Sequence, residues 1–198
     1  MKSMYVRASV SALCAALLAG CGGGDDGSLV LQVTINSLTK QGLVLTSGSQ
    51  ELPVSPTGAG TMYATFPNLI EEDSTIDVKI KTQPTAAECR IDPKTVGLKA
   101  NYYTARQVVI NCTTNSYTLG GTIVGLTGEG LILNNGDQQV KPAAGSVEFK
   151  FANNVADGAN YGVTVLYQPA GQVCTVANNA GTMPSGPVTN IAVTCTKA

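Results

Sequence analysis

Apolar and polar residues alternate along most of the chain after residue 28, which is the pattern of β-strands rather than helices. A strand with this period of two buries one face and leaves the other in water. The alternation therefore predicts an all-β protein with half-buried strands. It runs through Met62, Ala64 and Phe66; Ile76, Val78 and Ile80; Val108, Ile110 and Cys112; Val147, Phe149 and Phe151; Tyr161, Val163, Val165 and Tyr167; and Ile191, Val193 and Cys195.

Turn residues separate these strands at the spacing of a β-sandwich. Asn134-Asn135-Gly136-Asp137 follows an apolar run and precedes a polar one, which is a strong hairpin signal. Thr46-Ser47-Gly48-Ser49 is a weaker signal at the matching place. About seven short strands in roughly 85 residues predict an antiparallel β-sandwich.

The sequence also repeats itself. Gly42-Leu43-Val44-Leu45 recurs 88 positions later as Gly130-Leu131-Ile132-Leu133. Further matches at offsets of 85 and then 83 join Phe66 to Phe151, Gln83-Pro84 to Gln168-Pro169, Cys89 to Cys174 and Cys112 to Cys195. Small changes of offset are typical of insertions in surface loops. We therefore predict two tandem modules, at residues 29–113 and 116–198.

The repeated motif has a known counterpart. Gly-Gly-Thr at 120–122, Gly-Leu-x-Leu at 130–133, Gln168-Pro169 and the two cysteines resemble an immunoglobulin-like repeat of proteobacterial surface lipoproteins. Residues 116–198 match throughout, whereas the first copy departs from the motif. It has Val33, Ser37 and Lys40 where the second has Gly121, Gly125 and Gly128. The resemblance implies an Ig-like sandwich and an envelope location, and it implies no activity.

Residues 1–20 have the composition of a bacterial signal peptide. Lys2 and Arg7 precede a short apolar stretch, which is too short to span a bilayer. The segment ends in Leu18-Ala19-Gly20-Cys21, which resembles the lipobox of bacterial lipoproteins. The resemblance implies that Cys21 becomes the acylated first residue of the mature protein. An ordinary secretory signal followed by an unrelated cysteine is the alternative.

The residues after Cys21 fit that anchor. Residues 21–28 are rich in Gly and Asp, as in a flexible polar tether. By analogy with enteric lipoproteins, Gly22 after the cysteine implies transport to the outer membrane, on its surface or its periplasmic face. Two or three acyl chains give stable anchoring, so the membrane is the first expected partner.

Composition removes several classes of function. The chain of 198 residues contains no His, and only 13% of its residues are charged. His-dependent triads and most zinc sites are therefore excluded. The formal net charge is −1, and no basic stripe is present to bind nucleic acid. We expect no cofactor and no metal.

Six cysteines divide by position. Cys14 lies in the signal and Cys21 in the lipobox. Cys89, Cys112, Cys174 and Cys195 remain, and four cysteines allow three pairings. The duplication favours one disulfide inside each module, in an oxidising compartment. A redox pair or a four-cysteine zinc site is the alternative, although no Cys-x-x-Cys is present.

Candidate chemistry outside the cysteines is sparse. Glu71-Glu72-Asp73 is either a polar loop or a calcium-binding loop, and Asn134, Asn135 and Asp137 are a second source of oxygen ligands. Tyr102 and Tyr103, with Arg106, form either an exposed patch for a glycan or partner, or core and edge packing, which we expect.

These patterns lead to one functional hypothesis with two alternatives. The chain is expected to be a non-catalytic outer-membrane lipoprotein whose modules bind a protein or carbohydrate partner or have a structural role. The first alternative is a periplasm-facing accessory of an envelope complex. The second is a carbohydrate-active enzyme with a pair of carboxylates in a cleft between the modules.

Overall fold

The computed structural model describes residues 27–58 and 60–198, so the signal segment and Cys21 lie outside the described residues. The chain is all-β, as predicted, and it folds into β-sandwiches with two short 3₁₀ turns. The first module contains β1 (Ser28–Leu29), β2 (Gln32–Asn36), β3 (Leu43–Ser47), β4 (Gln50–Val54), β5 (Thr61–Thr65), β6 (Ile70–Glu71), β7 (Val78–Thr82), β8 (Ala87–Ile91), η1 (Pro93–Thr95), η2 (Thr104–Arg106) and β9 (Val108–Thr114). The second contains β10 (Ser116–Tyr117), β11 (Leu119–Val124), β12 (Ile132–Asn135), β13 (Gln138–Val140), β14 (Glu148–Lys150), β15 (Val155–Ala156), β16 (Asn160–Tyr167), β17 (Gln172–Ala177), β18 (Ala180–Thr182) and β19 (Val188–Lys197).

The two modules use the same strand order. In the first, the sheet β5-β2-β9-β8 faces the sheet β4-β3-β7 across an apolar core. In the second, β14-β11-β19-β17 faces β13-β12-β16-β18 across a separate core. The additional strand β18 lies where the first module has the 3₁₀ segment between β8 and β9. Inward-facing residues, which alternate with outward-facing residues along each strand, make up each core. This is the packing that sequences with a period of two produce.

One pairing in each module departs from an antiparallel sandwich. The first long strand of each module runs parallel to its last strand: β2 pairs with β9, and β11 pairs with β19. Because parallel strands begin at the same end, the chain enters each module beside the residues that precede its last strand. We call this the proximal end of the module, and we call the opposite end its distal end.

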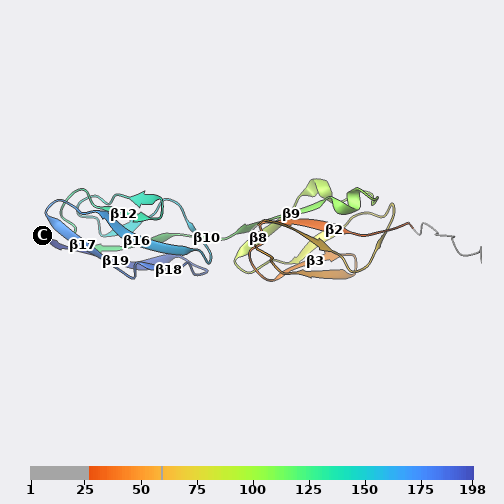
Figure 1. Cartoon of the computed structure of the whole chain (residues 1–198), viewed down its shortest axis with the longest axis horizontal. Coiled ribbons are helices and arrows are strands. Elements are labelled where there is room, and N and C mark those ends of the chain that lie inside the picture. Colours follow the sequence, from red (N-terminus) through yellow and green to blue (C-terminus); the bar gives the residue numbers. More distant parts are fainter. Residues whose placement is uncertain (1–26, 59) are drawn as a thin grey trace, which may run out of the picture.

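The modules lie end to end, with the described N-terminal residues and the C-terminus at opposite ends of the molecule (Figure 1). Strand β9 leads into β10 through the single residue Asn115. The distal end of the first module therefore meets the proximal end of the second, and the proximal end of the first lies beside Gly27, where the described chain begins.

Both predicted hairpin turns are confirmed. Ser47 pairs with Gln50 across β3 and β4, and Asn135 pairs with Gln138 across β12 and β13. Gly48 and Gly136 occupy the turns with φ of 58° and 60°, in the left-handed region that glycine adopts without strain.

Two positions of the alternating pattern are exposed, although the pattern predicts them to be buried. Val147 precedes β14 and is 72% exposed, and Tyr167 at the end of β16 is 62% exposed. Both lie where a strand begins or ends, so the sheet no longer covers the side chain. The alternation therefore predicts the strand correctly but not the burial of its terminal residues.

The departures of the first copy from the motif have a physical reason. A Cβ on Gly121 would lie 1.9 Å from the Ile191 carbonyl oxygen, at the register shift that the β11–β19 ladder has between Leu119 and Gly121. In the first module β2 pairs with β9 without such an irregularity, and Val33 fits there. The first module thus has room for a side chain where the second requires glycine.

Candidate functional site

The cysteines that lie in the described residues form two disulfides. Cys89 is bonded to Cys112 and Cys174 to Cys195, which is the pairing within modules that the repeat favours. In each module the two cysteines are direct cross-strand partners, and all four are buried. Buried, structural disulfides are inert toward thiol exchange. This placement favours a stabilising role over the redox alternative.

A glutamine supports each disulfide. The Gln83 side-chain amide donates to the Cys89 carbonyl at 2.9 Å, and its oxygen accepts from the Cys89 N–H at 2.8 Å. Gln168 makes the same two contacts with Cys174, at 3.1 and 2.7 Å. The glutamine side chain forms hydrogen bonds with the backbone N–H and carbonyl of a buried cysteine in an edge strand. Without a partner, these buried polar groups would destabilise the fold. This explains why Gln-Pro precedes the first cysteine in both copies.

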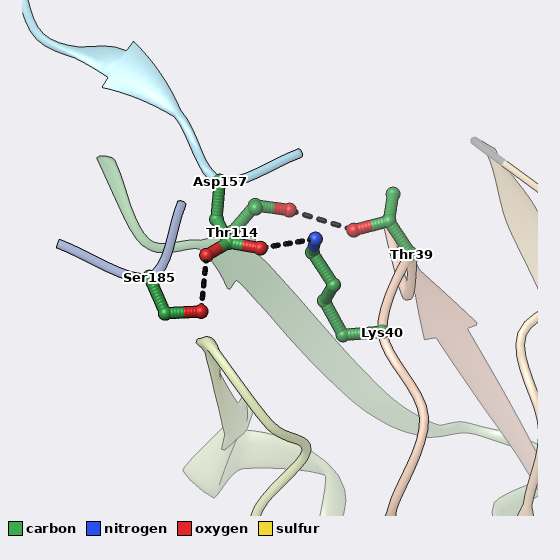
Figure 2. A network of polar contacts seen from close by, with 5 residues as sticks. All are labelled: Thr39, Lys40, Thr114, Asp157 and Ser185. Carbon is green, nitrogen blue, oxygen red and sulfur yellow. Dashed lines mark hydrogen bonds and ion pairs between the residues drawn. The ribbon is translucent and has the colours of Figure 1, made fainter. Parts of the chain in front are cut away.

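The junction between the modules contains a polar network that the sequence analysis missed (Figure 2). Lys40, in the loop after β2, places its Nζ 2.5 Å from Oδ1 of Asp157 in the second module. Ser185, in the loop before β19, donates its hydroxyl to Oδ2 of the same carboxylate at 2.6 Å. The side chains of Lys40 and Asp157 are 22% and 9% exposed. One carboxylate therefore ties together three loops from two modules.

The electrostatics of Asp157 follow from these contacts. The hydrogen bond from Lys40 and then that from Ser185 lower the pKa of the Asp157 carboxyl below its usual value. Both donors favour the charged form, which outweighs the opposing effect of desolvation. The ion pair is therefore fully formed at neutral pH, and it is lost only when the pH falls through this lowered pKa.

Backbone hydrogen bonds reinforce the same junction. The Asn115 N–H donates to the Ala86 carbonyl of the first module at 2.9 Å. Its carbonyl accepts from the Asp157 N–H of the second module at 2.8 Å. The hydroxyls of Thr39 and Thr114 are 2.7 Å apart on the first module's side of the junction (Figure 2). The connecting residue is thus hydrogen-bonded to both modules, as a strand residue would be.

A signal for this site was present in the repeat. Lys40 stands where the second copy has Gly128, and a Cβ on Gly128 would lie 2.3 Å from the Ala170 carbonyl oxygen. A lysine at that position of the turn therefore exists only in the first copy, at the end that meets the second. The partner could not be predicted, because Asp157 is 117 residues away and the relative placement of the modules was unknown.

The aromatic pair lies on the surface, contrary to the core or edge packing expected. Tyr102 and Tyr103 are 62% and 72% exposed. Their ring centroids are 5.4 Å apart in an edge-to-face arrangement, and the Arg106 guanidinium lies 4.2 Å from the Tyr102 centroid. The pair belongs to the segment between β8 and β9, at the proximal end of the first module.

The backbone of the acidic run pairs with neighbouring segments of the first module. Glu71 lies in β6, the Glu72 N–H bonds to the Gly27 carbonyl, and the Asp73 N–H bonds to the Ala100 carbonyl. Among the described residues, no group of three or more His, Cys, Asp or Glu side chains could hold a metal ion. Backbone pairing therefore accounts for this run, as the polar-loop interpretation requires.

The oxygen ligands of the second hairpin are used within the fold. Asn134 accepts from the Thr164 hydroxyl, and Asn135 accepts from the Gly162 N–H. A shallow pocket of about 610 Å³ beside this hairpin is lined by four amide side chains and one carboxylate, Asp137, together with apolar and backbone groups. A single carboxylate does not provide the acid and base pair of glycoside hydrolysis.

No protein-family model matches the sequence, and no curated protein sequence matches it. Among solved structures, the major pilin T-13 of Streptococcus pyogenes aligns at a TM-score of 0.34 and 11% identity, covering 85% of this chain and 97% of the pilin. The major pilin T3.2 of the same organism aligns at 0.29 and 11% identity, covering 88% and 99%. Among the described residues, no helix is long and apolar enough to cross a membrane.

Proposed function

We propose that this protein is a lipid-anchored, non-catalytic spacer of the bacterial cell envelope, held at the outer membrane through Cys21. The lipobox at Leu18–Cys21 supports the anchor. The junction supports the spacer role, because Asn115 is hydrogen-bonded to both modules and Lys40 pairs with Asp157 across them. Fixed end-to-end modules carry the distal end of the second module away from the bilayer.

The same observation argues against an active site between the modules. The cross-module contacts place one carboxylate, Asp157, at the junction, and Lys40 neutralises it. An ionised carboxylate held by a lysine and a serine is poorly suited to act as a general acid or base at neutral pH. A structural or binding role fits this junction better than carbohydrate hydrolysis does.

The anchor is tested by acylation of the full chain in a Gram-negative host. Labelled palmitate is expected to enter the wild type, because the thiol of Cys21 accepts a diacylglyceryl group whose fatty acyl chains carry the label. The variant Cys21→Ala is expected to take up no label and to remain unprocessed. Cys14→Ala is the matched control, because it changes a cysteine within the signal segment and leaves the lipobox intact.

Palmitate in the Cys21→Ala protein would refute the anchor. Protease treatment of intact and permeabilised cells then separates the two proposed faces of the outer membrane. Digestion in intact cells would favour a surface protein that binds an external protein or carbohydrate. Protection until permeabilisation would favour a periplasmic accessory of an envelope complex.

A further inference from the structure

The proximal end of the first module brings several chain segments together beside the tether. Val33 pairs with Val108 in the parallel β2–β9 ladder, so η2, which directly precedes β9, lies at the level where the chain enters the module. The Glu72 N–H donates to the Gly27 carbonyl, and the neighbouring Asp73 N–H donates to the Ala100 carbonyl. Residues 93–107, which we call the proximal segment, are therefore tied to the start of the described chain.

Exposed aromatic rings are held in place on this segment. Asn101 Oδ1 accepts from the N–H groups of Tyr103 and Thr104, both at 2.9 Å, which fixes the turn that carries the rings. Arg106 lies over the Tyr102 ring, and Tyr103 packs edge-on against it. Two large amphipathic side chains thus remain in water although the surrounding backbone is ordered. Such side chains suit a boundary that is apolar on one side and wet on the other.

The charges of the proximal segment point to a phosphate-bearing surface. Lys94, Lys99 and Arg106 lie in residues 93–107, and no Asp or Glu does. The ion pairs formed between described residues use other basic side chains, namely Lys40, Lys79, Lys81 and Arg90. The acidic run 71–73 and Asp92 border the segment, so the whole end carries both signs of charge. A zwitterionic phospholipid headgroup, with a phosphate and an amine, complements that arrangement.

The second module shows how its own proximal end is covered. Its β11–β19 ladder is also parallel, so the loop before β19 lies at the junction, where Ser185 bonds to Asp157. That end rests on the first module. The equivalent end of the first module lies where the described chain begins, and it alone carries the aromatic pair.

The short length of chain between Cys21 and the first module favours the bilayer as the partner of the proximal segment. Seven Cα–Cα steps separate Cys21 from Ser28, and at about 3.3–3.6 Å each they span at most about 25 Å. If Cys21 is acylated, the proximal segment is confined close to the bilayer surface. We propose that this segment docks on the phospholipid surface, with Tyr102 and Tyr103 at the interface and its three cations near the phosphates. The inference rests on the proposed anchoring through Cys21.

Docking can be tested with tryptophan reporters, because the chain contains no Trp. Tyr103→Trp places the reporter in the proximal segment. Tyr167→Trp is the matched control, since Tyr167 is similarly exposed but lies on β16 of the second module. Both full-length acylated proteins are reconstituted into vesicles of phosphatidylethanolamine and phosphatidylglycerol, with and without brominated acyl chains. We then measure flotation of the protein with the vesicles, the wavelength of maximum tryptophan emission, and quenching of that emission by the brominated lipid.

The proposal expects both proteins to float with the vesicles. It expects a blue shift and strong quenching by brominated lipid for Tyr103→Trp, and neither change for Tyr167→Trp. Flotation of both without quenching of Tyr103→Trp would overturn docking and leave the anchor intact. Failure of both acylated proteins to float would overturn the anchor, and docking with it. Equal quenching of both reporters would show a molecule lying flat on the bilayer, which also contradicts docking by the proximal segment.

Discussion

A single carboxylate, Asp157, connects the two modules at the scale of individual residues. The carboxylate accepts hydrogen bonds from Lys40 of the first module and from Ser185 of the second. The backbone N–H of Asp157 donates to the Asn115 carbonyl. The Lys40 hydrogen bond is the largest cause of its lowered pKa. Because the folded-state pKa is below the unfolded one, the carboxylate stabilises the folded chain above the unfolded pKa. That contribution disappears as the pH falls through the folded value.

This assignment predicts the titration of Asp157 measured by carbon NMR of its carboxyl group. The wild-type midpoint is expected below the usual aspartate value, and Lys40→Met is expected to raise it because the main hydrogen-bond donor is lost. Lys79→Met is the control, since Lys79 pairs with exposed Asp77 away from the junction. An unchanged Asp157 midpoint in Lys40→Met would show that the ion pair does not form.

Residue-level prediction from sequence succeeded where the repeat supplied a partner. The four disulfide cysteines were found because each occupies a matching place in both copies. Lys40 and Asp157 were not paired in advance, because the contact depends on how one module rests on the other. Tyr102 and Tyr103 are exposed, although the sequence analysis expects core or edge packing. Two adjacent aromatic residues have no periodicity, so their sequence does not distinguish an ordered exposed turn from a buried position.

At the scale of elements, the parallel pairing of first and last strands determines where the loops lie. The alternating pattern predicted the strands and the hairpins, but it contains no information on strand direction. The β2–β9 and β11–β19 ladders bring the loops before β9 and β19 to the proximal ends. This explains why one of these loops lies at the junction and the other lies beside the start of the described chain.

The disulfides act on the last two strands of each main sheet. Cys89 and Cys112 are 23 residues apart, and the bridge joins β8 to β9. Removing it with the double variant Cys89→Ala/Cys112→Ala is expected to cost the first module about 3 kcal/mol of unfolding free energy, mainly through the entropy of the unfolded chain. Chemical denaturation followed by NMR signals from each module measures this loss.

The matched control is Cys174→Ala/Cys195→Ala, which removes the equivalent bridge from the second module. Each double variant is expected to destabilise mainly the module that contains it, because the two cores share no residues. Equal destabilisation of both modules by either variant would show that they unfold as one cooperative unit. That result would contradict two modules that unfold independently of each other.

At the scale of the whole molecule, two similar sandwiches become one extended body through the contacts at Asn115, Lys40 and Asp157 (Figure 1). The sequence predicted modules placed end to end with a very short connection. It could not predict whether they are docked, because this depends on side chains from three loops. A fixed arrangement is what distinguishes a spacer from two independently moving domains.

The most direct test of this account is a residual dipolar coupling measurement on the mature chain carrying Cys21→Ser, at neutral pH. That substitution removes the acylation site and leaves both modules unchanged. Backbone couplings from residues 29–113 and 116–198 are expected to fit one common alignment tensor in the observed orientation, because the junction holds the modules together. Two tensors that differ in magnitude or orientation would show independently moving modules and would contradict the rigid spacer.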